Sequence, residues 1–163
     1  MARVFSVGGS NLTLAGATTL VFVNPAAAPK PNIEFLRFWA SQAANATSAQ
    51  QRIQVETQVT AFPTLTSATP RALTPGDTNA SFITGNTTGA AGTCGVNASA
   101  EGAGSKTSIW DDAFNVLNGY LWVATPRETL VMPAGYASGA GLYFPVAPAT
   151  LTTWQVGANF AEV

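Results

Sequence analysis

The chain has no histidine and only one cysteine, Cys94, among its 163 residues. Without histidine it lacks the usual general base near neutral pH and the commonest metal ligand in proteins. A single cysteine forms no disulfide within the chain, so the fold does not depend on an oxidising compartment. No basic residue stands near Cys94 in the sequence to lower its pKa, which argues against a catalytic thiolate.

Charge is also scarce. Charged residues make up 9% of the chain, against about 25% in ordinary soluble proteins. The net charge is −1 and the seven basic residues are scattered singly, so the basic patch that nucleic-acid binding requires is missing. A surface with few charges is weakly protected against association. We therefore expect no nucleic-acid partner, and we expect much of the surface to lie against other subunits.

Long apolar runs are missing as well. No stretch approaches the roughly 18 residues that are needed to cross a bilayer. Residues 1–3 are basic and residues 26–28 resemble a cleavage site, but the polar residues 8–11 interrupt the apolar stretch that a signal peptide needs. We expect a chain without a signal peptide and without a membrane partner.

The chain does contain short apolar segments, separated by glycine, proline and asparagine. The clearest is Arg52 to Thr60, where apolar and polar residues alternate as in a strand with one face toward solvent. No segment has a convincing helical period. We predict a single all-β domain over residues 1–163, an antiparallel β-sandwich or jelly roll of about eight to ten strands. Further strands are expected in residues 3–23, 33–42, 81–83, 142–146 and 150–160, and an edge strand or surface crossover in residues 62–77.

Residues 110–133 predict the organising element of this fold. Asn118 and Gly119 stand between two apolar runs, which is typical of a two-residue type I′ hairpin. A second turn at residues 125–128 and a third strand at residues 129–132 complete a β-meander. Its large apolar side chains would anchor the core; they are Phe114, Tyr120 and Trp122. The strands on either side of residues 43–49 predict a second hairpin with a longer loop.

Two segments allow both a structural and a functional interpretation. Residues 24–32 are rich in proline and form either a rigid crossover between sheets or a hinge. A hinge would make residues 1–23 an arm that docks on a neighbouring subunit, and its candidate contact residues are Val4, Phe5, Val7, Leu12 and Leu14. Residues 85–106, which are mostly Gly, Ala, Thr, Ser and Asn, predict a flexible loop that is either passive or a second contact arm.

No motif of established chemistry is present. Asp111 and Asp112 form the only acidic pair, which fits the start of a turn or calcium ligation. Neighbouring residues of a strand point to opposite faces, so the pair would share a metal only within a turn. Residues 135–141 are rich in glycine but lack the lysine and the following helix of a phosphate-binding loop. We expect no enzyme activity, no cofactor and no metal.

Four stretches of the chain carry a family resemblance: MARVFSVGGSNLTLAG, RIQVETQVTAFPTLTSATP, FNVLNGYLWVATPRETLVMPAG and LTTWQVGANFAEV. Together they resemble small virion proteins of tailed bacteriophages, of the head decoration or cement type. The resemblance implies an all-β homotrimer, made in the host cytoplasm, that clamps neighbouring subunits of the major capsid protein on the outside of the virion. It implies no functional residue by position.

Two other functions are compatible with the same sequence. A carbohydrate- or receptor-binding jelly roll of a phage tail or bacterial surface would expose tryptophans in a groove beside polar side chains. The candidates are Trp39, Trp110, Trp122 and Trp154, although tryptophan is mostly found in protein cores. A shell-forming coat protein is the third hypothesis, but a major tailed-phage capsid subunit is normally longer and contains helices.

Overall fold

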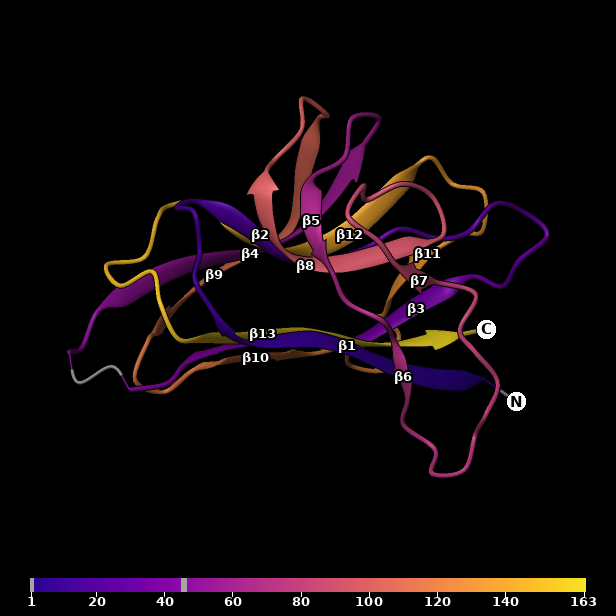
Figure 1. The fold of residues 1–163 in the computed structure, drawn as a ribbon, viewed down its shortest axis with the longest axis horizontal. Helices are drawn as coiled ribbons and strands as arrows, with labels where there is room; N and C mark the ends of the chain where they lie inside the picture. Colours follow the sequence, from indigo (N-terminus) through magenta and orange to yellow (C-terminus); the bar gives the residue numbers. More distant parts are fainter. Residues whose placement is uncertain (1, 45–46) are drawn as a thin grey trace.

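The chain folds into two β-sheets that pack face to face (Figure 1). The computed structural model describes residues 2–44 and 47–163. This part of the chain contains thirteen strands and no helix, and therefore no helix that could span a membrane. The predicted class, a single all-β sandwich domain, is confirmed. The strand number is higher than expected because several strands have only two to four residues.

Sheet A has six strands and sheet B has seven. The strands of sheet A, in spatial order, are β10 (Tyr120–Val123), with β11 (Leu130–Met132) on the same edge, β3 (Ile33–Gln42), β13 (Trp154–Glu162), β1 (Arg3–Leu12) and β6 (Arg71–Ala72). The strands of sheet B are β5 (Thr64–Ser67), with β7 (Thr84–Gly85) on the same edge, β8 (Thr93–Ala100), β2 (Thr18–Val23), β12 (Ser138–Phe144), β4 (Gln50–Val59) and β9 (Lys106–Asn115).

The order of the strands is jelly-roll-like. Strands β1 to β4 alternate between the two sheets, and so do β9 and β10, then β12 and β13. The last two strands take the central positions, β12 between β2 and β4, and β13 between β1 and β3. All pairings among the described strands are antiparallel except the short one between β7 and β8. This arrangement is the double Greek key of jelly rolls, with β6 added to one sheet and β5, β7 and β8 to the other.

Apolar residues that alternate along the strands fill the space between the sheets. In β13 the side chains of Trp154, Val156 and Phe160 point inward and are fully buried. Phe144 of β12 meets Trp154 edge to face with ring centroids 4.9 Å apart, which joins the two central strands across the sandwich. Phe114 is buried in the same core, as predicted, while Tyr120 and Trp122 pack against its rim.

The described part of the predicted N-terminal arm, residues 2–23, belongs to the sheets of the sandwich and does not form an arm. Strand β1 lies between β13 and β6, and β2 lies between β12 and β8. Phe5, Val7 and Leu14 are buried, and Val4 and Leu12 are half-buried. The proline-rich residues 24–32 lead from β2 in sheet B to β3 in sheet A, which is the crossover interpretation. The alternating apolar residues of β1 are therefore buried between the two sheets of the same chain and not against a neighbouring subunit.

Residues 85–106 are not a loop, because β8 occupies Thr93–Ala100 and pairs with β2 at residues 94–96 and with β5 on its other side. The small residues of this segment are a packing requirement. A Cβ atom at Gly95 would lie 2.7 Å from both Leu65 Cβ and Thr66 O of the neighbouring strand β5. Only glycine fits such an approach, so a composition that suggested flexibility encodes close contact instead.

The predicted β-meander and the predicted second hairpin are also wrong, because the strands that were expected to pair lie in different sheets or pair with another strand. Strand β9 belongs to sheet B and β10 to sheet A, while β10 and β11 both pair with β3. Of the Asn118-Gly119 pair only Gly119 has a positive φ, 70°, whereas a type I′ turn needs two such residues. Residues 43–49 likewise connect β3 in sheet A to β4 in sheet B, and residues 45–46 lie outside the described part.

Some strands begin or end at other residues than predicted, because pairing with distant strands sets their limits. The brief pairing expected at residues 81–83 occurs at Thr84–Gly85, and β12 begins at Ser138, within the predicted glycine-rich turn of residues 135–141. The crossover expected in residues 62–77 holds: β5 lies on the edge of sheet B and β6 on the edge of sheet A. Long-range pairing therefore sets where these strands begin and end.

The position of Phe5 gives a test of the N-terminal segment. Its ring is buried and stacks on Phe160 at 5.8 Å. We predict that Phe5→Ala lowers the free energy of unfolding by about 3–5 kcal/mol, measured by urea denaturation. Val4→Ala, on the outward side of the same strand, should lower it by less than about 1 kcal/mol. Equal and small effects of both changes would restore the arm interpretation.

Candidate functional site

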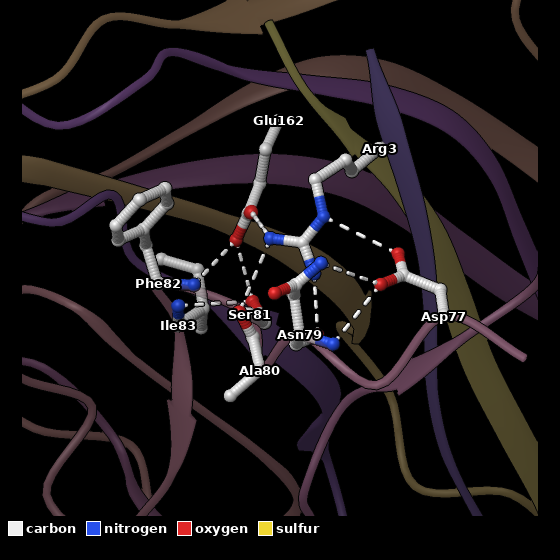
Figure 2. A network of polar contacts seen from close by, with 8 residues as sticks. All are labelled: Arg3, Asp77, Asn79, Ala80, Ser81, Phe82, Ile83 and Glu162. Atoms are coloured by element: carbon white, nitrogen blue, oxygen red, sulfur yellow. Dashed lines mark hydrogen bonds and ion pairs between the residues drawn. The ribbon is translucent and has the colours of Figure 1, made fainter. Parts of the chain in front are cut away.

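A network of polar contacts joins the two ends of the chain to the β6–β7 connection (Figure 2). Arg3 of β1 and Glu162 of β13 stand opposite each other in register, with Arg3 Nη1 3.7 Å from Glu162 Oε2. The other carboxylate oxygen of Glu162 accepts hydrogen bonds from Ser81 Oγ at 2.5 Å and from the backbone N–H of Phe82 at 2.7 Å. The Arg3 side chain also donates to Asp77 Oδ2 through Nε at 3.3 Å.

The contacts of this network hold the connection in place. The Arg3 guanidinium donates to the carbonyl oxygens of Asn79 and Ala80. The backbone N–H of Asn79, followed by Arg3, lowers the pKa of Asp77 below its ordinary value. Within residues 2–44 and 47–163, no group of three His, Cys, Asp or Glu side chains is placed to hold a metal ion. We assign the network to closing one end of the sandwich.

A second charged cluster lies on sheet B. Lys106 Nζ lies 3.0 Å from Glu56 Oε1 and 2.5 Å from Glu101 Oε2, and it sits over the Tyr143 ring at 3.6 Å from the centroid. Glu101 also accepts hydrogen bonds from the N–H and the hydroxyl of Thr19. The β4–β5 and β8–β9 connections, which project together in Figure 1, bond to each other nearby. The cluster fixes these two connections to the sheet.

Burial raises the pKa of Glu56 to about 7, although Lys106 acts in the opposite direction. The alternation of β4 predicted a solvent-facing side at this position, but Glu56 and Gln58 are buried. Gln58 Nε2 donates to the carbonyls of Ala61 and Glu101, so the two connections cover this part of the strand. The alternation of apolar and polar residues identified the strand β4. It did not show that Glu56 and Gln58 are buried, because the connections that cover them include residues distant in the sequence.

Cys94 is buried in β8 and burial raises the pKa of its thiol to about 12. Its Sγ lies 3.1 Å from the carbonyl oxygen of Ala68. A thiol in this environment stays protonated, and the thiolate is the nucleophilic form. The side chain therefore serves as a small core residue.

Apolar side chains gather where the two sheets leave an open edge. Among the described strands, β9 pairs only with β4 and β10 only with β3, so each has one free backbone edge. Apolar side chains on these strands and on β11 are between 45% and 61% exposed. They form what we call the edge surface: Ile109, Trp110, Leu121, Val123 and Val131. Exposed apolar residues that lie together mark interaction sites more often than scattered ones do.

All residues of the edge surface except Val131 line a groove of about 560 Å³ between β9 and the β10–β11 segment. Ile109 and Trp110 line one side, at a point where β9 bulges by one residue against β4. Leu121 and Val123 line the other side. Polar side chains at the rim include Asp112 and Glu128. The described lining has no basic residue, so the groove is apolar with an acidic margin.

The acidic pair predicted to start a turn lies instead within β9. Asp111 accepts hydrogen bonds from Gln54 Nε2 at 2.8 Å and Arg52 Nη2 at 2.9 Å, and these bonds, Gln54 first, lower its pKa. Asp112 lines the groove. The two carboxylates have separate surroundings, as alternation along a strand requires.

The structure separates the four tryptophans. Trp154 is fully buried, Trp110 is half exposed, and Trp39 and Trp122 are intermediate. Trp122 packs against Phe38 with ring centroids 5.6 Å apart. Trp110 and Trp39 therefore remain as surface candidates. The sequence did not distinguish the four tryptophans, because which face of a strand is covered depends on how the two sheets pack.

Comparison with known proteins gives no match: no protein-family model, no curated protein and no solved structure is similar to this chain.

The raised pKa of Glu56 leads to a stability prediction. Between its ordinary pKa of 4.5 and the folded value of about 7, the folded chain holds one proton more than the unfolded chain. The free energy of unfolding should therefore fall as the pH rises through this window and level off above it.

Urea denaturation at several pH values from about 5 to 8 measures this dependence. Glu56→Gln should make stability nearly constant there, while the exposed control Glu128→Gln should keep the wild-type slope. A slope that persists in Glu56→Gln would assign the titration to another group.

Proposed function

We propose that this chain is a structural virion protein that binds the outside of a tailed-bacteriophage head and stabilises it, as decoration or cement proteins do. The edge surface is the observation that carries the proposal. Five apolar side chains stay exposed on it although the sandwich core is already complete. The likeness of the sequence to small phage virion proteins supports the same function.

The chemistry of the edge surface suits a protein partner. An apolar centre with a polar rim is the usual composition of a protein–protein interface. The free backbone edges of β9 and β10 offer hydrogen bonds to an extended segment of a partner chain. The acidic margin of the groove, from Asp112 and Glu128, favours a partner that presents basic or amide groups there.

The expected partner is the major capsid protein, and the expected assembly is a homotrimer with closed cyclic symmetry. We assign the capsid contact to the edge surface and no longer to the N-terminal segment, because β1 and β2 are part of the sandwich. The protein would be made in the host cytoplasm and reside on the virion exterior. Its scarcity of charge fits a subunit whose surface lies against neighbours.

The direct test mixes the purified chain with expanded phage heads that lack it. We expect stoichiometric binding in multiples of three and a higher temperature of head disruption. Particles formed by the chain alone would favour the shell-forming coat hypothesis instead. Absence of the chain from purified virions would contradict every virion function.

Two variants of similar chemistry locate the contact. Val123 on the edge surface and Val146 outside it are almost equally exposed, at 53% and 54%. We predict that Val123→Asp weakens head binding by at least about tenfold, because it places a charge in an apolar interface. Val146→Asp should bind as the wild type does.

Trp110→Ala should lower the affinity more than Val123→Ala, since tryptophan contributes strongly at interface centres. Equal loss from both aspartate variants would reject the edge surface as the contact.

A further inference from the structure

The outer face of sheet A carries a tryptophan that lies on glycine. Three strands place Trp39 of β3, Gly157 of β13 and Gly8 of β1 opposite one another in one register row. A Cβ atom at Gly157 would lie 2.1 Å from Trp39 Cζ2, 2.6 Å from Cη2 and 2.7 Å from Cε2. Several atoms of the ring at such similar distances mean that the indole lies flat over the glycine, which no larger residue would allow.

The ring therefore has one side on the sheet, and it remains partly exposed. Trp39 lines a hollow of about 650 Å³ that β1, β13 and β6 of sheet A bound together with β5 and β8 of sheet B. It also lines a smaller hollow of about 180 Å³ toward the turn at Gly119. A flat aromatic ring between two hollows is a platform on which a planar or disc-shaped group can stack. We call this feature the Trp39 platform.

Polar side chains surround the platform. The larger hollow is lined by Ser10, Ser67, Thr69, Arg71 and Gln155, and none of its described lining residues is acidic. In the part of the chain that the structure describes, no hydrogen bond or ion pair engages the Arg71 guanidinium, the Gln155 amide or the Trp39 indole N–H. These donors are available to a ligand, and a ligand that satisfies several of them would gain orientation.

The Trp39 ring, together with the Arg71 guanidinium and the Gln155 amide, favours one class of stacking ligand over others. A hexopyranose has a C–H face that packs on the negative face of an indole ring, and its rim carries hydroxyls that accept hydrogen bonds. A nucleic-acid strand would need clustered basic residues along its phosphates, and Arg71 is the only one lining this hollow. A proline-rich peptide would need a groove lined by several aromatic rings.

We propose that the outer face of sheet A binds a saccharide, with a hexopyranose unit stacked on Trp39 and its hydroxyls bonded by Arg71 and Gln155. The inference goes beyond head binding, because the larger hollow beside Trp39 and the groove between β9 and the β10–β11 segment have no described lining residue in common. The smaller hollow beside Trp39 extends to Leu121, which also lines the groove. On a virion it would give the bound subunit an affinity for sugars of a cell surface. The binding requires no covalent step and no cofactor.

The experiment uses the purified chain of residues 1–163 on a glycan array that carries neutral, N-acetylated and uronic-acid oligosaccharides. The oligosaccharide that gives the strongest signal is then titrated in solution, by calorimetry and by tryptophan fluorescence. We expect binding with a change in fluorescence, and we expect Trp39→Ala to weaken it by about tenfold or more. Arg71→Ala and Gln155→Ala, which alter exposed residues and should leave the fold intact, should each weaken binding several-fold.

Reciprocal variants separate this proposal from head binding. Trp110→Ala, on the edge surface, should lose affinity for heads and keep its affinity for sugar. Arg71→Ala should lose affinity for sugar and keep head binding. The saccharide proposal is overturned if no glycan binds at millimolar concentration, or if the variants at Trp39, Arg71 and Gln155 all bind as the wild type does. Either result leaves the head-binding test unaffected.

Discussion

The insertion of the last two strands into the middle of the sandwich is the constraint on which the rest of the structure depends. Strand β13 separates β1 from β3, and β12 separates β2 from β4. Phe160 of β13, for example, lies opposite Phe5 of β1 and opposite Phe35 of β3. Neither sheet closes until the C-terminal residues are in place, so the core forms through contacts between distant parts of the chain. Folds of this kind gain stability late and fold slowly.

The same insertion explains why so many residues are small. Phe22 of β2 lies against β12, where a Cβ atom at Gly139 would be 2.3 Å from its ring. Trp39 lies on Gly157 of β13 in the same way. Large rings in one strand cover glycines in the next, which seals the backbone and leaves no room for a side chain. A composition rich in glycine and alanine thus belongs to closely packed, ordered sheets.

Several of the chain's few charges are paired with one another. The network of Arg3 with Glu162 and the cluster around Lys106 also engage Asp77, Glu56 and Glu101, and of these residues Glu56 and Glu162 are buried. The exterior is weakly charged because charged residues make up only 9% of the chain. The edge surface and the Trp39 platform lie on this weakly charged exterior, at an open edge and on an open face. One offers apolar area and free backbone, and the other offers a ring with polar donors, so they suit different partners.

The sequence by itself determined the class of fold, because alternation of period two and the absence of a helical period leave a β-sandwich as the way to bury the apolar residues. It also located β3 without error and the inward residues of β13, where apolar and β-favouring residues are dense. Only the tertiary structure decided which strands pair. Asn118 and Gly119 mark a reversal of the chain, but a local turn does not reveal that the following strand crosses to the other sheet. The network of Arg3 with Glu162 and the platform of Trp39 on Gly157 join residues far apart in the chain, and their proximity follows from β13 lying between β1 and β3.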